Sequence, residues 1–340
     1  MIRTHSSLKI VWVEVGRRLP RYAARNIVLT AKNHPSLEQI MVTDSVTNLK
    51  HAKMVRTQEI EKSSLTLQFH SIRKEWAFKQ QYFWQGTTAR FFHLYDVMKA
   101  LNIENVLHLE TDCVLLEPES LDSISRSTHI DLAYPLQAQG IGCASIFYIR
   151  NHEALGQFLE FIIKNWHRQD VDDMTLLGDY SNRSDVKILP SKFEDGQKES
   201  DYLFDAQSVG KFFLGTDARN CRLPFSKRGL GDSRAGSVTD DFISKDLIWN
   251  IPCKSKRLEL SLQRSGSGSK SKFANVHVHS KFISRSSLRM KIIFKLSFGR
   301  NRNWFWRIGF IDVAVLTERA ASFIARRVLR LENFQERIFR

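Results

Sequence analysis

The 340-residue chain is poor in cysteine, and its four cysteines form no Cys-x-x-Cys pair. Zinc ribbons and disulfide-stapled domains need closely spaced cysteines, so the sequence argues against both and fits a reducing compartment. An apolar run of about 18 residues, the length that a membrane-spanning helix needs, is also missing. The first residues lead into a predicted strand without an apolar targeting stretch, and we expect a cytoplasmic protein without a signal peptide.

Glycine-rich phosphate-binding motifs are missing as well. Strand patterns at 9–14 and 39–43 enclose a helical pattern at 20–32, the β–α–β order with which nucleotide-binding α/β sheets begin. This opening contains neither Gly-x-Gly-x-x-Gly nor a P-loop, which argues against a dinucleotide or Walker-type phosphate cradle. The opening therefore predicts an α/β sheet without either cradle.

Positive charge is in excess, with 51 Lys and Arg against 36 Asp and Glu and a formal net charge of +15. The composition, 42% apolar and 26% charged, is that of a globular protein with one large α/β domain or two smaller ones. Residues 285–340 hold 11 Arg and 2 Lys against 4 acidic residues. This balance favours an anionic partner: nucleic acid, a diphosphate substrate or an acidic membrane surface.

The most informative stretch is a short apolar run, 106–109, that leads directly to Glu110 and Asp112. Such a run predicts a buried strand of an α/β sheet, and ligands of these sheets bind at the carboxyl ends of the strands. Two carboxylates two positions apart in an extended chain point to the same side, so both can bind one divalent cation. The alternative is a polar strand end with a turn-forming Asp.

A helix is predicted just before this strand, over 83–101, where apolar residues recur at helical spacing. Arg90 falls on the apolar stripe of that helix, on the side of the core. Because burying an unpaired charge is costly, we expect Arg90 to be ion-paired or to face a ligand.

A second group of chemically active side chains lies in the alternating stretch 275–281. As a strand, this stretch places His277, His279 and Lys281 on one face. One imidazole can complete the coordination of Mn²⁺ or Mg²⁺ held by carboxylate and diphosphate oxygens, and Lys281 can meet the phosphates as a point charge. The alternative is a solvated strand face that carries two histidines.

Three motifs together resemble the GT-A class of glycosyltransferases: the Phe-Trp…Arg-Phe helix at 83–91, His-Leu-Glu-Thr-Asp at 108–112 in place of Asp-x-Asp, and His-Val-His-Ser-Lys at 277–281. The resemblance covers residues 8–282. It implies a Rossmann-like α/β fold with a mixed sheet flanked by helices. It also implies transfer of a sugar from a nucleotide-diphosphate sugar to a hydroxyl of a glycan or lipid-linked acceptor, as in polysaccharide biosynthesis.

The resemblance also implies roles for single residues. Mn²⁺ or Mg²⁺ would be held by Glu110 and Asp112 with His277 or His279. The implied catalytic residues are Arg90, Asp173, Asp217 and Lys281. The implied nucleotide-sugar residues are Val15, Gly16, Asp44, Arg90, Gly142, Cys143 and Lys281. Simpler interpretations stay open for three of these features: Asp44 as a turn residue, 139–144 as a flexible loop, and Asp173 as an acid that complements a helix dipole.

The rest of the chain yields three expectations. We expect a helix from Phe204 to Gly215, and strands at 248–250 and 257–262 that resume the sheet. The basic tail, 285–340, contains a nearly continuous apolar run with tryptophans at its start, which favours an amphipathic helix on the inner membrane surface. The alternative is a pair of helices packed on the catalytic domain at 8–282.

Two other classes of protein stay open. A nucleic-acid-binding protein would explain the net charge, but the basic excess is concentrated in the tail, away from the acidic motif, and we expect no nucleic-acid partner. A metal-dependent nucleotidyltransferase or phosphohydrolase would also use paired carboxylates, but these enzymes usually gather a denser acidic set around two metals.

Overall fold

The computed structural model describes residues 8–16, 18–45, 48–72, 81–138, 140–168, 171–191, 201–207, 209–210, 247–250, 259–264 and 270–278. The predicted site residues Asp217, His279 and Lys281, and the tail at 285–340, lie outside these ranges. Among the helices that fall within them, none is both long and apolar enough to cross a bilayer.

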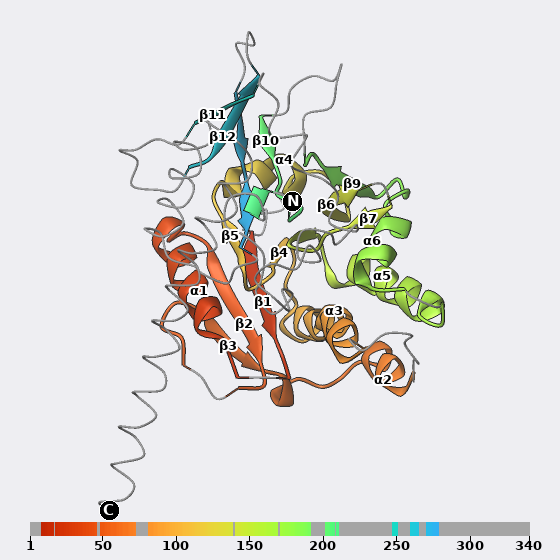
Figure 1. Ribbon diagram of the computed structural model, residues 1–340. Coiled ribbons are helices and arrows are strands. Elements are labelled where there is room, and N and C mark those ends of the chain that lie inside the picture. The colour runs from red at the N-terminus through yellow and green to blue at the C-terminus, as the bar shows by residue number, and fades with distance from the viewer. Residues whose placement is uncertain are drawn as a thin grey trace, which may run out of the picture.

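Within the described residues, a mixed eight-stranded sheet forms the centre of the fold (Figure 1). Its strands are β1 (Lys9–Glu14), β2 (Glu38–Thr43), β3 (Lys53–Arg56), β4 (Val106–Leu109), β6 (Leu132–Ala138), β7 (Ile141–Gly142), β8 (Ile146–Ile149) and β9 (Val186–Leu189). Their order is β3-β2-β1-β4-β8-β6-β7, with β9 paired to β6. The strands β1 to β4 are parallel, and β8 is antiparallel to β4. The carboxyl ends of β1, β2, β3 and β4 therefore meet at one edge, where such sheets bind ligands.

Helices cover both faces of this sheet (Figure 1). They are α1 (Arg21–Asn33), α2 (Ser64–Ser71), α3 (Gln81–Leu101), α4 (Asp122–Ser125), α5 (His152–Asn165) and α6 (Asp173–Tyr180), with 3-10 turns η1 (Thr57–Glu59) and η2 (Pro118–Leu121). Alternation along β1 assigns the faces, because successive side chains of a strand point to opposite sides. Val11 and Val13 join the core with α3 and α5, whereas Ile10 and Trp12 join the core with α1. The predicted α/β fold is confirmed.

Three helices begin at residues whose side chains cap the backbone. Ser63, Asn151 and Asp172 precede α2, α5 and α6, and each accepts the N–H of the residue three positions later. Capping satisfies N–H groups that have no partner inside the helix. The predicted helices at 20–32 and 83–101 are found with shifts of one or two residues at their ends.

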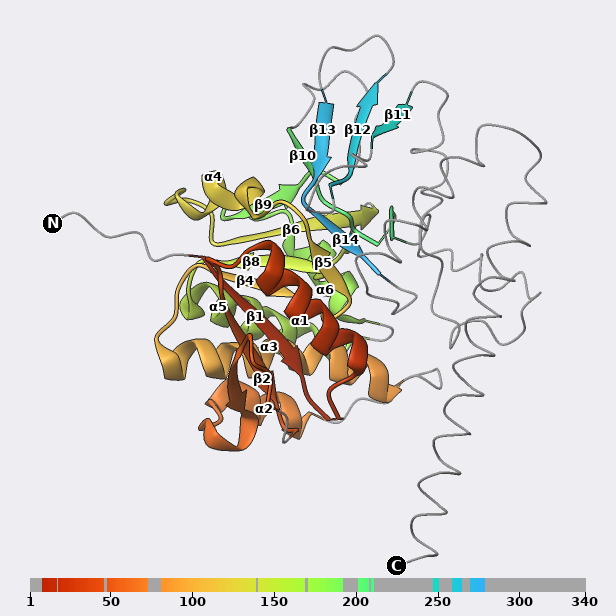
Figure 2. The ribbon, with the colours of Figure 1, turned by 90° about the vertical axis from the view of Figure 1, so that its left-hand side faces the viewer.

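The later strands form a separate sheet instead of resuming the central one. This sheet has the order β10 (Tyr202–Leu203), β13 (Lys270–Phe273), β12 (Ser261–Arg264) and β11 (Leu247–Asn250). Strands are thus found at 247–250 and 261–264, but the expectation that they resume the central sheet is wrong. The reason is local, because β12 and β13 follow each other in the chain and pair as antiparallel neighbours. Strand β14 (Asn275–His277) leaves the small sheet and pairs with β5 (Cys113–Leu115) (Figure 2).

The helix expected from Phe204 does not begin there. The chain from Phe204 to Gln207 is non-helical, and Gln207 has a φ of 86°. The Asp205 carboxylate accepts the N–H groups of Val209 and Gly210, at 2.9 and 2.8 Å. In a continuous helix these two N–H groups would instead donate to the backbone carbonyls of residues 205 and 206.

Candidate active site

The turn between β4 and β5 carries the acidic pair at the ligand-binding edge of the sheet. The Cys113 N–H closes the turn by donating to the Glu110 carbonyl at 2.8 Å. Thr111, between the two acids, donates its hydroxyl to Glu14 at the end of β1, at 2.9 Å. Asn26 of α1 donates to the carbonyls of Thr111 and Cys113. The turn is therefore fixed by the sheet on one side and by a helix on the other.

Strand β14 brings His277 to this turn from 165 positions later in the sequence. Pairing of β14 with β5 places His277 opposite Cys113, and the next residue, Val278, donates its N–H to the Asp112 carbonyl at 2.7 Å. The imidazole Nε2 of His277 lies 3.1 Å from Asp112 Oδ1 and 3.2 Å from Glu110 Oε2. The side chains are 4%, 7% and 18% exposed for His277, Asp112 and Glu110, so the histidine does not lie on a solvated strand face.

This cluster has the chemistry of a divalent metal site. One ligand atom from each of Glu110, Asp112 and His277 lies within 4.8 Å of the other two. Two carboxylate oxygens and one imidazole nitrogen suit Mn²⁺ and are compatible with Mg²⁺. Burial lowers the pKa of His277, but the neighbouring Cys143 and the charge of Glu110 raise this pKa by more, so the net shift is upward. A cation would therefore compete with a proton for Nε2 of His277.

Arg90 of α3 links the acidic pair to a third carboxylate. Its guanidinium forms ion pairs with Glu110 and with Asp173 at the start of α6, the latter at 2.9 Å. The Arg90 side chain is 14% exposed. The expectation that Arg90 is ion-paired is confirmed, and the partners are two residues that the sequence analysis assigned to the site.

Asp173 is the most buried of these acids, with a side chain that is 3% exposed. Burial raises its pKa to about 6, although the neighbouring charge of Arg90 lowers it. Thr87 of α3 also donates to Asp173, at 3.4 Å. A carboxyl group with a pKa near 6 is ionised at neutral pH and still able to take up a proton.

Helix α6 is held in place by close contacts at two glycines. A Cβ atom at Gly142 would lie 2.3 Å from the Leu177 Cβ, and one at Gly178 would lie 1.9 Å from the Gly140 carbonyl oxygen. The Tyr134 hydroxyl donates to the Leu177 carbonyl at 2.7 Å. The missing side chain of Gly142 makes room for α6, and a role of Gly142 at the nucleotide sugar stays a prediction. This packing places Asp173 beside Arg90.

The residues predicted at the nucleoside lie together after β1 and β2. Gly16 follows Val15 with a φ of 83°, and its N–H donates to Asp44 Oδ2 at 2.8 Å. A positive φ is easy only for glycine, so this turn depends on Gly16. The bond joins the ends of β1 and β2.

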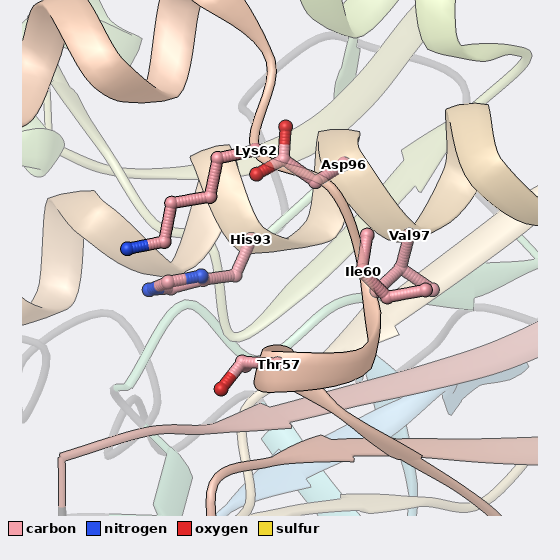
Figure 3. Close-up of a pocket in the computed structure, with 6 residues that line it drawn as sticks. All are labelled: Thr57, Ile60, Lys62, His93, Asp96 and Val97. Carbon is pink, nitrogen blue, oxygen red and sulfur yellow. The ribbon is translucent and has the colours of Figure 1, made fainter.

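A small pocket lies beside the end of β3, apart from the acidic cluster. It is lined by Thr57, Ile60, Lys62, His93, Asp96 and Val97 (Figure 3). Asp96 is buried and accepts the Ser63 N–H at 3.1 Å and the Thr66 hydroxyl at 2.8 Å, so it stabilises the start of α2. The pocket contains none of the three candidate metal ligands.

Sequence reasoning missed residues that support the site without carrying its chemistry. Glu14 and Thr111 bond to each other beneath the acidic turn, and Asn275 donates to Cys113 Sγ at 3.2 Å. Asp205 accepts the His277 N–H at 2.8 Å. The bond between Asp205 and residue 277 had no local signal in the sequence.

Comparison with known proteins gives structural likeness alone. No family model matches the chain, and no curated protein matches its sequence. Among solved structures, apo mouse xyloside xylosyltransferase 1 is 8% identical, with a TM-score of 0.39 over 54% of this chain and 85% of that one. The glycosyltransferase GlyE of Streptococcus pneumoniae TIGR4 is 12% identical, with a TM-score of 0.33 over 54% of this chain and 46% of that one.

A cytidylyltransferase from Leptospira borgpetersenii is also similar, at 10% identity and a TM-score of 0.33 over 69% of this chain and 92% of that one. The chain thus spans less than half of the GlyE structure and most of the other two.

Proposed function

We propose that this protein is a glycosyltransferase that moves a sugar from a nucleotide-diphosphate sugar to a hydroxyl acceptor. The observation that carries the proposal is the convergence of Glu110, Asp112 and His277 at the carboxyl edge of the parallel strands, beside the Arg90–Asp173 ion pair. This places metal-binding groups and a fixed cation where an α/β sheet binds ligands. A diphosphate that leaves the sugar carries negative charge, which a bound metal ion and a fixed cation can neutralise.

The proposed reaction breaks the bond between the anomeric carbon and the β-phosphate oxygen. A bond forms between the anomeric carbon and the acceptor oxygen, and the acceptor proton passes to a base or to solvent. Mn²⁺ or Mg²⁺ held by Glu110, Asp112 and His277 would neutralise the charge of the departing diphosphate. Arg90 is held by two carboxylates, so its charge needs no reorganisation during the reaction.

The remaining predicted residues take roles around these groups. Val15, Gly16 and Asp44 would contact the nucleoside, with the Asp44 carboxylate accepting from the ribose. Asp173 would face the sugar, where an ionised carboxylate can accept hydrogen bonds from hydroxyl groups. Gly142 and Cys143 would lie at the donor sugar. The proposal also gives roles in the site to His279, Lys281 and Asp217.

The proposed acceptor is a glycan or a lipid-linked glycan at the inner membrane surface. This part of the proposal rests on the charge of residues 285–340 and on their apolar run. A membrane-docked enzyme would remain near a membrane-bound acceptor, so fewer productive encounters would be lost to diffusion.

The proposal is tested with a panel of nucleotide-diphosphate sugars, with and without Mn²⁺. Thermal shift measures binding, and hydrolysis of the donor measures chemistry. We expect one donor to stabilise the protein in a metal-dependent way and to release nucleoside diphosphate. Release of pyrophosphate from a nucleoside triphosphate and a sugar phosphate would indicate a nucleotidyltransferase instead.

A further inference from the structure

Asp205 lies beside the metal cluster but is not one of its three ligands. It follows β10, and its relative exposure is 0%. Its carboxylate accepts three backbone N–H groups, from Val209 at 2.9 Å, Gly210 at 2.8 Å and His277 at 2.8 Å. Hydrogen bonds from N–H groups to an ionised carboxylate are stronger than those between neutral groups. One of them acts on the residue whose imidazole faces Glu110 and Asp112.

The backbone of Asp205 is fixed as well. Its N–H donates to Asn275 Oδ1 at 3.0 Å, and its carbonyl accepts from Asn275 Nδ2 and from the Ser145 hydroxyl, both at 3.2 Å. The Ser145 carbonyl in turn accepts the Glu110 N–H at 3.1 Å. Asp205 is therefore bonded to both sides of the cluster, to β14 at His277 and, through Ser145, to the chain at Glu110.

Two contacts besides strand pairing hold the backbone of His277. Strand β14 has only three residues, and the N–H of its last residue, His277, donates to the Asp205 carboxylate. The backbone at Gly210 also packs closely against the backbone of His277. A Cβ atom at Gly210 would lie only 1.7 Å from the His277 carbonyl oxygen. The backbone of His277 is thus held between an acceptor and a close backbone contact.

From these contacts we propose that Asp205 is a positioning residue for the metal centre. It holds the His277 backbone at the place where Nε2 meets both carboxylates. It therefore acts through His277 and does not contact the metal ion itself. The inference rests on the metal site of the proposed function. Small displacements of a ligand weaken metal binding, and loss of an outer partner of a ligand commonly costs about 10–100-fold in affinity.

The test measures Mn²⁺ binding to the full-length protein by electron paramagnetic resonance of the free ion. We expect Asp205→Asn to weaken Mn²⁺ binding about tenfold or more, because the amide cannot accept all three N–H groups. The matched control is Asp96→Asn, which alters another buried carboxylate that accepts a backbone N–H, in the pocket of Figure 3. This control should lower the melting temperature and leave Mn²⁺ affinity unchanged.

A double-mutant cycle with His277→Ala shows whether Asp205→Asn weakens Mn²⁺ binding through His277 or by destabilising the whole site. In the His277→Ala background, Asp205→Asn should cost no further Mn²⁺ affinity; an undiminished cost there would overturn the inference. Folding of each variant is checked by near-ultraviolet circular dichroism. If Asp205→Asn does not fold, Ser145→Ala removes one bond to Asp205 and should weaken Mn²⁺ binding about threefold, and unchanged binding would contradict the inference.

The wild-type measurement distinguishes this inference from the proposed function. If the wild-type protein binds no Mn²⁺, the metal centre itself is wrong and the inference falls with it. If wild type binds Mn²⁺, His277→Ala binds it measurably more weakly and folded Asp205→Asn binds it as tightly as wild type, the metal centre stands and Asp205 is a structural residue only.

Discussion

His277 reaches Asp112 across the antiparallel pairing of β14 with β5, with Nε2 of the histidine 3.1 Å from Oδ1 of the aspartate. The same two segments are joined by their backbones, because Val278 donates to the Asp112 carbonyl at 2.7 Å. The late strand and the acidic turn are therefore one structural unit. Any cation bound by Asp112 would also depend on the pairing of β14.

We expect Asp112→Ala to abolish Mn²⁺ binding and donor hydrolysis while the protein stays folded. Loss of a ligand should cost more than the roughly 10–100-fold that loss of an outer partner costs. Glu119→Ala is the control, because Glu119 belongs to another acidic pair two positions apart, with Glu117, and is exposed. Full hydrolysis by Asp112→Ala in the presence of a chelator would refute the metal assignment.

Arg90→Lys should reduce kcat/KM for donor hydrolysis about a hundredfold, or about 3 kcal/mol. A lysine keeps the charge but lacks the planar guanidinium that binds Glu110 and Asp173 together. The control is Arg56→Lys at the exposed pair with Glu59, where exposed ion pairs contribute little. Equal activity of Arg90→Lys and wild type would remove Arg90 from the catalytic residues.

The acidic turn and the helix before it were predictable because their signals are local. The run at 106–109 and the helical spacing around Arg90 each lie within one element, so periodicity alone indicates a buried strand and a core-facing arginine. The ion-pair partners of Arg90, in contrast, have no local signal in the sequence. The ion pair with Asp173 joins residues 83 positions apart, and the packing of α6 on Gly142 depends on contacts that no periodicity reports.

The supporting residues were missed for a related reason. Asp205 binds backbone N–H groups, and a backbone partner leaves no trace in the sequence of the partner residue. The small sheet was also missed, because alternation predicts that a strand forms but not which strand it pairs with. The sequence was therefore informative about the residues of the candidate site and uninformative about the contacts that hold them in place.

The buried His108 of β4 predicts loss of stability in acid. It donates through Nδ1 to the Val11 carbonyl at 3.0 Å, and burial, together with the charge of Arg90, lowers its pKa from 6.5 to about 4. The contribution of neutral His108 to the free energy of unfolding is fully present above pH 6.5, where His108 is neutral in both the folded and the unfolded state. As the pH falls from 6.5 toward 4, the unfolded state takes up a proton first, and about 3 kcal/mol is lost.

This pH effect is measured by urea unfolding at several pH values between 7 and 4. His108→Asn keeps a donor for Val11 and removes the titrating group. We expect the variant to be less stable at pH 7 and to lose less stability than wild type between pH 6.5 and 4. Parallel pH profiles for the two proteins would show that His108 does not set this slope.

Lys281 lies outside the described residues, and its role remains a prediction from the alternation of 277–281. If Lys281 meets the diphosphate, Lys281→Ala should weaken binding of nucleoside diphosphate about tenfold and leave binding of free nucleoside unchanged. Lys270→Ala is the control, since Lys270 is exposed on the small sheet. Equal losses for both ligands, measured by calorimetry, would return Lys281 to a structural role.

The last prediction concerns the basic tail at 285–340. Each basic residue near an anionic surface contributes about 1 kcal/mol, and the apolar run between its arginines can insert into the interface. We expect the full-length protein to float with anionic liposomes at low salt and to be released at high salt. A variant ending at Phe282 should stay in the soluble fraction and still bind donor nucleotide, because Gly16, Asp44 and the metal cluster all precede the cut. Full-length protein that remains soluble at low salt would assign the tail to packing on the catalytic domain, whereas binding that survives high salt would show that the apolar run dominates over charge.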